Sequence, residues 1–164
     1  MMDFSLHIYT NLLLALLDKA YTFQPFGEFI ESQKNKTIVM RHDVDRIPNN
    51  SLETANIENE LGIKGTYYFR AVPESYDEKI IKQIADLGHE IGYHYESLST
   101  CGGDLRLAID DFRFNLKKLR EICPVKTICM HGSPLSNYDN RLLWEKYDYR
   151  DFGIVGSPCE IKYL

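Results

Sequence analysis

Short apolar runs alternate with segments of helical periodicity along most of the chain. Runs rich in β-branched and aromatic residues indicate strands, and apolar residues spaced three and four apart indicate helices. The predicted strands are residues 37–41, 65–70, 90–94, 125–130 and 152–155. The predicted helices are residues 51–61, 75–87, 105–119 and 142–147. Because a helix that links two strands makes a crossover connection, the pattern predicts an α/β fold with a parallel sheet, either open or closed into a barrel.

The helix that begins at Leu105 has the clearest pattern in the chain. Asp104 stands where an N-cap residue is expected, and Pro124 follows the last apolar position. This helix is therefore predicted with defined ends.

The first twenty residues carry an apolar run that is too short for a membrane span. Leu6, Tyr9 and Leu13 keep helical spacing. Residues 4–20 are therefore predicted to form an amphipathic helix that lies on the core. The run from 12 to 17 falls well below the roughly 20 apolar residues of a membrane span. No Lys or Arg precedes it, which argues against a signal peptide and favours a cytoplasmic location.

Length and charge narrow the class of protein. A chain of 164 residues suits one domain, residues 1–164, whose barrel portion is predicted over 37–155. The formal net charge of −5 argues against a nucleic-acid partner, which needs a basic surface. Four cysteines stand apart with no C-x-x-C pair, and we expect them to be reduced thiols that pack in the interior. They are Cys101, Cys123, Cys129 and Cys159.

Metal-ligand residue types stand at the ends of three predicted strands. Asp43 and Asp45 follow the first strand, His94 ends the third, and His131 follows the fourth. In parallel α/β folds, functional sites lie where the strands end and the loops begin. In extended chain Asp43 and Asp45 point the same way, and two such carboxylates repel each other unless a cation lies between them or one of them is protonated. The pattern therefore favours a divalent metal site.

Each of these residues also has an ordinary structural interpretation. Asp43 and Asp45 are typical of a polar turn, where Arg41 or Arg46 would neutralise them. His131 can bind a metal, orient a carboxylate, shuttle a proton, or only bond to its own loop. The residues alone leave these alternatives open.

The segment 88–94 places one candidate ligand on a defined face. Strand alternation puts Glu90, Gly92 and His94 on the same side. Gly92 leaves space beside His94 for a ligand or a neighbouring backbone. His89 falls on the opposite side and is expected to be a structural residue.

Other common catalytic signatures do not occur. The sequence has no Gly-rich phosphate loop, no Gly-x-Ser-x-Gly nucleophile elbow and no His-Glu-x-x-His helix. Metal-dependent chemistry at the strand ends therefore remains the leading interpretation.

Three motifs in order carry a family resemblance. They are Arg41-His42-Asp43-Val44-Asp45, Gly65-Thr66-Tyr67-Tyr68-Phe69 and Gly88-His89-Glu90-Ile91-Gly92-Tyr93-His94. The series resembles the polysaccharide deacetylase family, of the carbohydrate esterase type, from about Thr37 to Val155. The resemblance implies the family's NodB-like deformed (β/α) barrel, here divergent and incomplete.

The resemblance also implies roles for individual residues. Asp43 matches the general base, and Asp45 and His94 match metal ligands. The family has a second histidine where this chain has Leu98, so a third ligand must come from elsewhere. The candidates are His131 and Glu96, in that order.

The family's later motifs differ most from this chain. Its Arg-Pro-Pro motif is similar to His131-Gly132-Ser133-Pro134 here, and its Leu-x-His motif, which supplies the general acid, would lie beyond Leu164. We therefore expect either a truncated form of a longer protein or an open variant that pairs with a second copy, with weak or no deacetylase activity. His131 is the candidate substitute acid.

The expected reaction is hydrolysis of an N- or O-acetyl group on a sugar, with zinc or a similar divalent metal as cofactor. Tyr93, Tyr95 and Arg41 are the candidates for contact with the carbohydrate substrate. The alternative is an inactive relative that binds carbohydrate or regulates another protein. A metal-dependent hydrolase of another substrate also fits, because a fold does not fix a function.

Overall fold

Parallel strands alternate with helices, as the sequence predicts. In this computed structural model, residues 5–132 and 136–160 are described. Four strands form a parallel sheet in the order β3-β4-β5-β6. They are β3 (Arg41–Val44), β4 (Thr66–Phe69), β5 (Glu90–Tyr95) and β6 (Val125–Met130). The predicted α/β class is therefore confirmed, and among the described residues the sheet is open.

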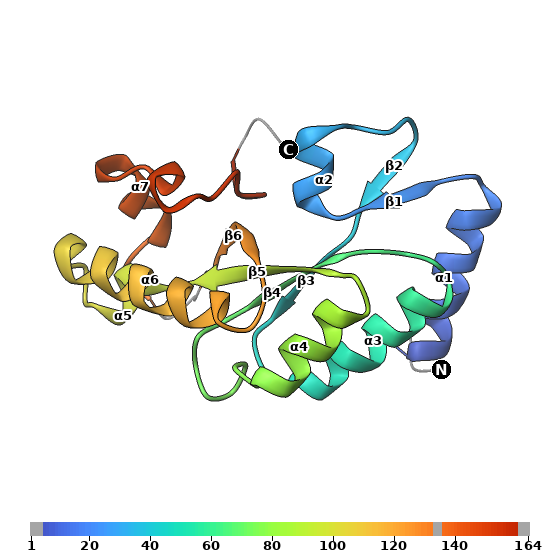
Figure 1. Ribbon diagram of the computed structural model, residues 1–164, viewed down its shortest axis with the longest axis horizontal. Helices are drawn as coiled ribbons and strands as arrows, with labels where there is room; N and C mark the ends of the chain where they lie inside the picture. Colours follow the sequence, from blue (N-terminus) through green and yellow to red (C-terminus); the bar gives the residue numbers. More distant parts are fainter. Residues whose placement is uncertain (1–4, 133–135, 161–164) are drawn as a thin grey trace.

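Helices connect these strands and cover the sheet. Between β3 and β5, α3 (Pro48–Glu60) and α4 (Glu78–Asp86) pack side by side on one face (Figure 1). Between β5 and β6 come the short α5 (Ser97–Thr100) and the long α6 (Leu105–Arg120). The Asp104 side chain accepts hydrogen bonds from the first turn of α6, so the predicted cap is confirmed. After β6 the described residues form three short helices: η1 (Asn140–Leu142), α7 (Leu143–Lys146) and η2 (Tyr149–Phe152).

A second, two-stranded parallel sheet lies beside α2. In Figure 1 it lies on the opposite side of the four-stranded sheet from α3 and α4. Its strands are β1 (Thr22–Gln24) and β2 (Thr37–Val39), and α2 (Phe26–Glu31) lies between them. The predicted strand 37–41 is thus split between two sheets at Met40. Periodicity does not identify β1 or α2, because each is too short for a repeating pattern.

The predicted strand 152–155 is wrong. Residues 149–152 form η2, and only a single bridge joins Gly156 to Thr127 of β6. Gly153 has φ 69°, a left-handed conformation that ends η2 and turns the chain toward β6. An apolar run of four residues is too short to distinguish a strand from a buried turn.

The N-terminal helix α1 (Leu6–Asp18) buries fewer apolar side chains than its helical spacing predicts. Leu13 is its one buried residue, whereas Leu6 and Leu12 are exposed. Phe4, at the start of the predicted range 4–20, lies outside the described residues. No helix in the described parts of the chain is both long and apolar enough to cross a membrane.

A buried carboxylate joins α1, α3 and the sheet. Glu58 of α3 is fully buried, and the hydroxyl groups of Tyr9 and Tyr67 donate hydrogen bonds to it. His42 Nε2 lies 2.5 Å from Glu58 Oε1. Burial raises the pKa of Glu58, but the hydrogen bonds from His42, Tyr9 and Tyr67 outweigh it and hold this pKa below its ordinary value. The charged carboxylate is therefore the form that the fold stabilises.

Glu58→Gln is expected to lower the free energy of unfolding by about 2–4 kcal/mol, because it removes a buried charge on which three donors converge. Urea denaturation at pH 7 measures this change. Glu53→Gln, on the exposed side of the same helix, is the matched control and should change stability little. Equal midpoints for the two variants would show that the Glu58 charge is not required.

The same contact predicts a pH dependence. The folded pKa of Glu58 lies below its unfolded value of about 4.3, so its stabilising effect is present above that pH and is lost as the pH falls through the folded pKa. The stability difference between wild type and Glu58→Gln should therefore shrink below about pH 4. Denaturation curves across pH 3–7 check this.

Candidate metal centre

Three strand ends bring four predicted site residues together. Asp43 lies at the end of β3 with Asp45 just beyond it, His94 lies on β5, and His131 follows β6. His94 Nε2 is 3.4 Å from Asp45 Oδ1 and 4.0 Å from Asp43 Oδ2. His131 Nδ1 is 3.1 Å from Asp45 Oδ1. The parallel strands thus gather two carboxylates and two imidazoles at one edge of the sheet.

Asp45, His94 and His131 have the spacing of a tetrahedral metal site. Their nearest ligand atoms form a triangle with sides of 3.1, 3.3 and 3.4 Å. Zinc binds nitrogen and oxygen ligands at about 2.0–2.1 Å, which places tetrahedral ligands about 3.3–3.4 Å apart. Two imidazoles and a carboxylate are also a usual ligand set for catalytic zinc. The residues therefore fit a zinc-like ion without large rearrangement.

A backbone contact fixes which nitrogen of His94 faces this triangle. His94 Nδ1 lies 3.0 Å from the carbonyl oxygen of Cys129, which can only accept, so Nδ1 carries the proton and Nε2 the lone pair. Burial lowers the pKa of His94, although the charge of Asp43 acts in the opposite direction. A neutral imidazole whose other nitrogen is hydrogen-bonded is the form that binds metals.

A local irregularity in β6 orients His131 toward the centre. Ile91 pairs with Val125 but Tyr93 pairs with Ile128, so β6 has one extra residue at this point. Beyond it, alternation places Thr127, Cys129 and His131 on one side of the strand. Thr127 contacts Glu90, and His131 reaches Asp45. The sequence does not reveal this bulge.

Arg70 and Glu96 form a second layer behind His131. Arg70 Nε and Nη2 donate to the two carboxylate oxygens of Glu96, both at 2.9 Å. Glu96 Oε2 lies 3.9 Å from His131 Nε2. Glu96 is thus engaged by Arg70 and lies behind the imidazole, which makes it a less suitable third ligand than His131. Arg70 follows β4 directly, and a search of all strand ends would have identified it.

Asp43 lies beside the triangle and is held by Arg41. Arg41 Nη2 donates to Asp43 Oδ2 at 2.9 Å. The side chain of Asp43 is 28% exposed and that of Asp45 is 51% exposed, so the centre opens to solvent. A cavity of about 340 Å³ lies at the opposite end of the strands, beside Gly88, Glu90 and Pro124.

Tyr93 and Tyr95 lie in the core and not at the rim. They are 2% and 1% exposed, Tyr93 packs on Phe112, and Trp144 Nε1 donates to the Tyr95 hydroxyl. Their side of β5 faces α6, away from His94. Core packing uses these rings, and the expectation that they contact the carbohydrate substrate is corrected accordingly.

The space beside Gly92 is filled by an aromatic ring. A Cβ at Gly92 would lie 2.2 Å from Cε1 of Tyr68, whose hydroxyl donates to Thr127. The glycine therefore admits the Tyr68 ring and not a ligand. His89 has the structural role expected of it: it accepts from the Gly65 N–H and donates to the Ala55 carbonyl.

Comparisons with known proteins give a distant structural likeness. No protein-family model matches the chain, and no curated protein matches it. Among solved structures, the chain is similar to Bacillus subtilis PdaA, described as a family 4 carbohydrate esterase, with 15% sequence identity and a TM-score of 0.45. The match covers 92% of this chain and 64% of that one, so this chain spans less than two thirds of its length. A likeness at this level does not show a shared activity.

His94→Ala is expected to lower zinc affinity at least ten-fold, because it removes the buried imidazole of the triangle. Isothermal titration of the metal-free protein measures this. His7→Ala on exposed α1 is the matched control, and His89→Ala should lower stability while leaving zinc affinity intact. Unchanged affinity in His94→Ala would remove His94 from the ligand set.

Proposed function

We propose that the chain binds one divalent metal, zinc by preference, through Asp45, His94 and His131, and that it hydrolyses an acetyl group from an N- or O-acetylated sugar. The observation that carries this proposal is the triangle of ligand atoms beside a second carboxylate, that of Asp43, which is not part of the triangle. The motif resemblance between residues 37 and 155 supports the substrate class.

The position of each residue indicates its role in the proposed reaction. A bound zinc ion supplies Lewis acidity to the acetyl carbonyl and to a water molecule. Asp43 accepts the water proton, since it lies next to the triangle and has side-chain exposure to solvent. Arg41 donates to Asp43 Oδ2 and so holds the carboxylate in place. Arg41 thereby gains a positioning role in addition to its proposed contact with substrate.

His131 fills the third metal-ligand position, for which the resemblance supplies no residue. Leu98 stands where the family has a second histidine, and it is 3% exposed within the core with no ligand atom to offer. His131 comes from the next strand and its Nδ1 completes the triangle. We therefore assign His131 to the metal and no longer to proton donation.

The assignment of His131 to the metal limits which leaving groups the centre can protonate. His42 is engaged by Glu58, His89 is buried and structural, and His7 lies on exposed α1, so no other histidine lies at the centre. An amine leaving group needs a proton donor, whereas the alkoxide of an ester leaves far more readily than an unprotonated amine nitrogen. We therefore expect O-acetyl esters to be cleaved faster than N-acetyl sugars, and N-acetyl sugars at well below about 1 per second.

Acetate release from an O-acetylated and an N-acetylated sugar oligomer, with the zinc-loaded chain, tests this order. Faster release from the N-acetyl substrate would contradict it and would indicate a proton donor at the centre. His131→Ala then separates the two roles, because a ligand loses zinc when replaced, whereas an acid loses activity with zinc retained.

Asp43→Asn is expected to abolish acetate release and to leave zinc affinity within about two-fold, because an amide cannot accept the water proton. Asp45→Asn should instead lose zinc. Both quantities are measured on the same preparations by acetate assay and by metal titration. If Asp43→Asn loses zinc while Asp45→Asn retains it, the two roles are reversed.

A second candidate function is carbohydrate binding without turnover. The core position of Leu98 favours it, because the histidine that the family has there is missing. This function predicts that acetylated sugar oligomers bind to the chain, while neither zinc nor Asp43 affects the binding. Acetate release that depends on Asp43 excludes it.

A further inference from the structure

Two cysteines that lie far apart in the sequence meet next to the candidate centre. Cys129 Sγ on β6 and Cys159 Sγ near the end of the described chain are 3.5 Å apart. Cys129 is 1% exposed and Cys159 is partly exposed. From the sequence, all four cysteines are expected to be separate packing residues, and the proposed function uses none of them.

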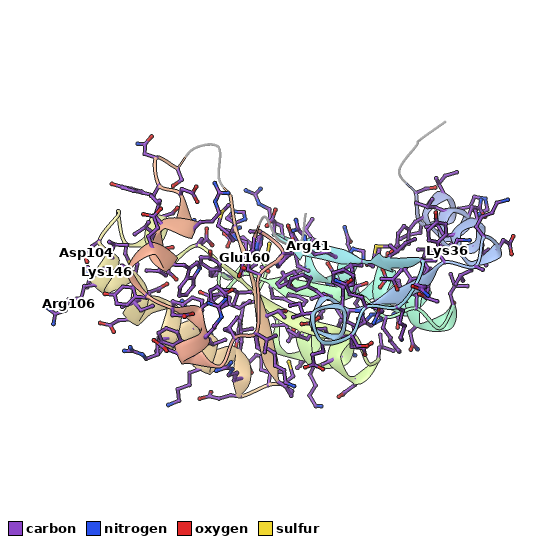
Figure 2. The ribbon with its side chains drawn as sticks, turned by 90° about the horizontal axis from the view of Figure 1, so that it is seen from above. Lys36, Arg41, Asp104, Arg106, Lys146 and Glu160 are labelled. Atoms are coloured by element: carbon purple, nitrogen blue, oxygen red, sulfur yellow. The ribbon has the colours of Figure 1, made fainter. Side chains whose placement is uncertain are left out.

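Backbone pairing, and not a chance side-chain approach, holds the two thiols together. The Val155 N–H donates to the Lys126 carbonyl at 2.8 Å, and the Ile128 N–H donates to the Gly156 carbonyl at 3.2 Å. Residues 155–160, called the C-terminal segment below, are therefore anchored to β6 through Val155 and Gly156. In the view of Figure 2, Glu160 lies in the middle of the molecule, between Lys36 toward one end and Asp104 toward the other.

We propose that Cys129 and Cys159 form a reversible dithiol–disulfide pair that fastens the C-terminal segment to the end of β6. A disulfide has an S–S bond of about 2.0 Å, so the two sulfurs need to approach by about 1.5 Å from their present separation. The paired backbones hold both residues in register during this shift.

A disulfide-containing small molecule such as glutathione disulfide would serve as the oxidant. Cys159 lines a cavity of about 320 Å³ together with Tyr95, Trp144 and Ser157, which gives such a molecule access to it. The Cys159 thiolate attacks the oxidant, forms a mixed disulfide and releases one glutathione thiolate. The Cys129 thiol then loses its proton, attacks the Cys159 sulfur and releases the second glutathione. The protein loses two thiol protons and two electrons, and the oxidant takes them up to become two thiols.

The disulfide would restrain the chain and engage a sulfur atom next to the candidate metal centre. It closes a loop over residues 129–159, which contains η1, α7 and η2. It also engages a sulfur that lies within 4.8 Å of the ligand atoms of Asp43 and His94. The pairing itself requires neither a metal nor an acetylated sugar, so it stands independently of the proposed function.

The test is thiol mapping on the full chain. The metal-free protein is incubated with glutathione disulfide and quenched with acid, and the remaining thiols are alkylated before digestion and mass spectrometry. We expect one linked peptide pair, joining Cys129 to Cys159, with Cys101 and Cys123 alkylated. Linkage to Cys101 or Cys123, or a mixed disulfide at Cys159 that does not resolve, would overturn the proposal.

Variants separate the pair from general thiol reactivity. The double variant Cys101→Ser, Cys123→Ser should form the same linkage, whereas Cys159→Ser should leave Cys129 unmodified. If Cys159→Ser fails to fold, the double variant still decides the question by itself. Closure of the loop should raise the thermal midpoint of the oxidised double variant by about 5–10 °C relative to its reduced form. An unchanged midpoint despite a mapped linkage would contradict the fastening role.

Discussion

The parallel pairing of β3, β4, β5 and β6 is the constraint on which the other features depend. In a parallel sheet all strands point the same way, so the carboxyl ends of β3, β5 and β6 meet at one edge, with Asp43, His94 and His131 there. The hydrogen bond from the His131 N–H to the Tyr95 carbonyl, at 2.8 Å, continues this pairing just past the end of β6. The triangle of ligand atoms is thus held by backbone contacts as well as by side chains.

The two sides of the sheet divide stability from chemistry. On one side, Tyr67 reaches Glu58 and Tyr93 packs on Phe112, so that side joins the helices to the strands. On the other side, Tyr68 occupies the space over Gly92, and polar side chains continue from Glu90 toward His94. Helices bury the first side of the sheet, and the charged groups lie on the second side, at the carboxyl ends of the strands.

Charged groups at the centre are fixed by partners outside it. The Cys129 carbonyl orients His94, Arg41 holds Asp43, and Glu96 lies behind His131. This arrangement resembles that of metal sites in general, in which outer contacts set the direction of the inner ligands. The same edge also holds Cys129 beside Cys159, which gives the centre a neighbour that responds to oxidation.

The sequence by itself determined the α/β class, the cap of α6, and the positions of Asp43, Asp45, His94 and His131 at strand ends. These depend on periodicities of two and 3.6 residues and on local capping, which neighbouring residues specify. Only the tertiary structure decided that Tyr93 and Tyr95 are core residues, that His131 and not Glu96 completes the triangle, and that Cys129 meets Cys159. Those outcomes depend on the register between strands and on the bulge in β6, which arise from contacts between residues far apart in the chain.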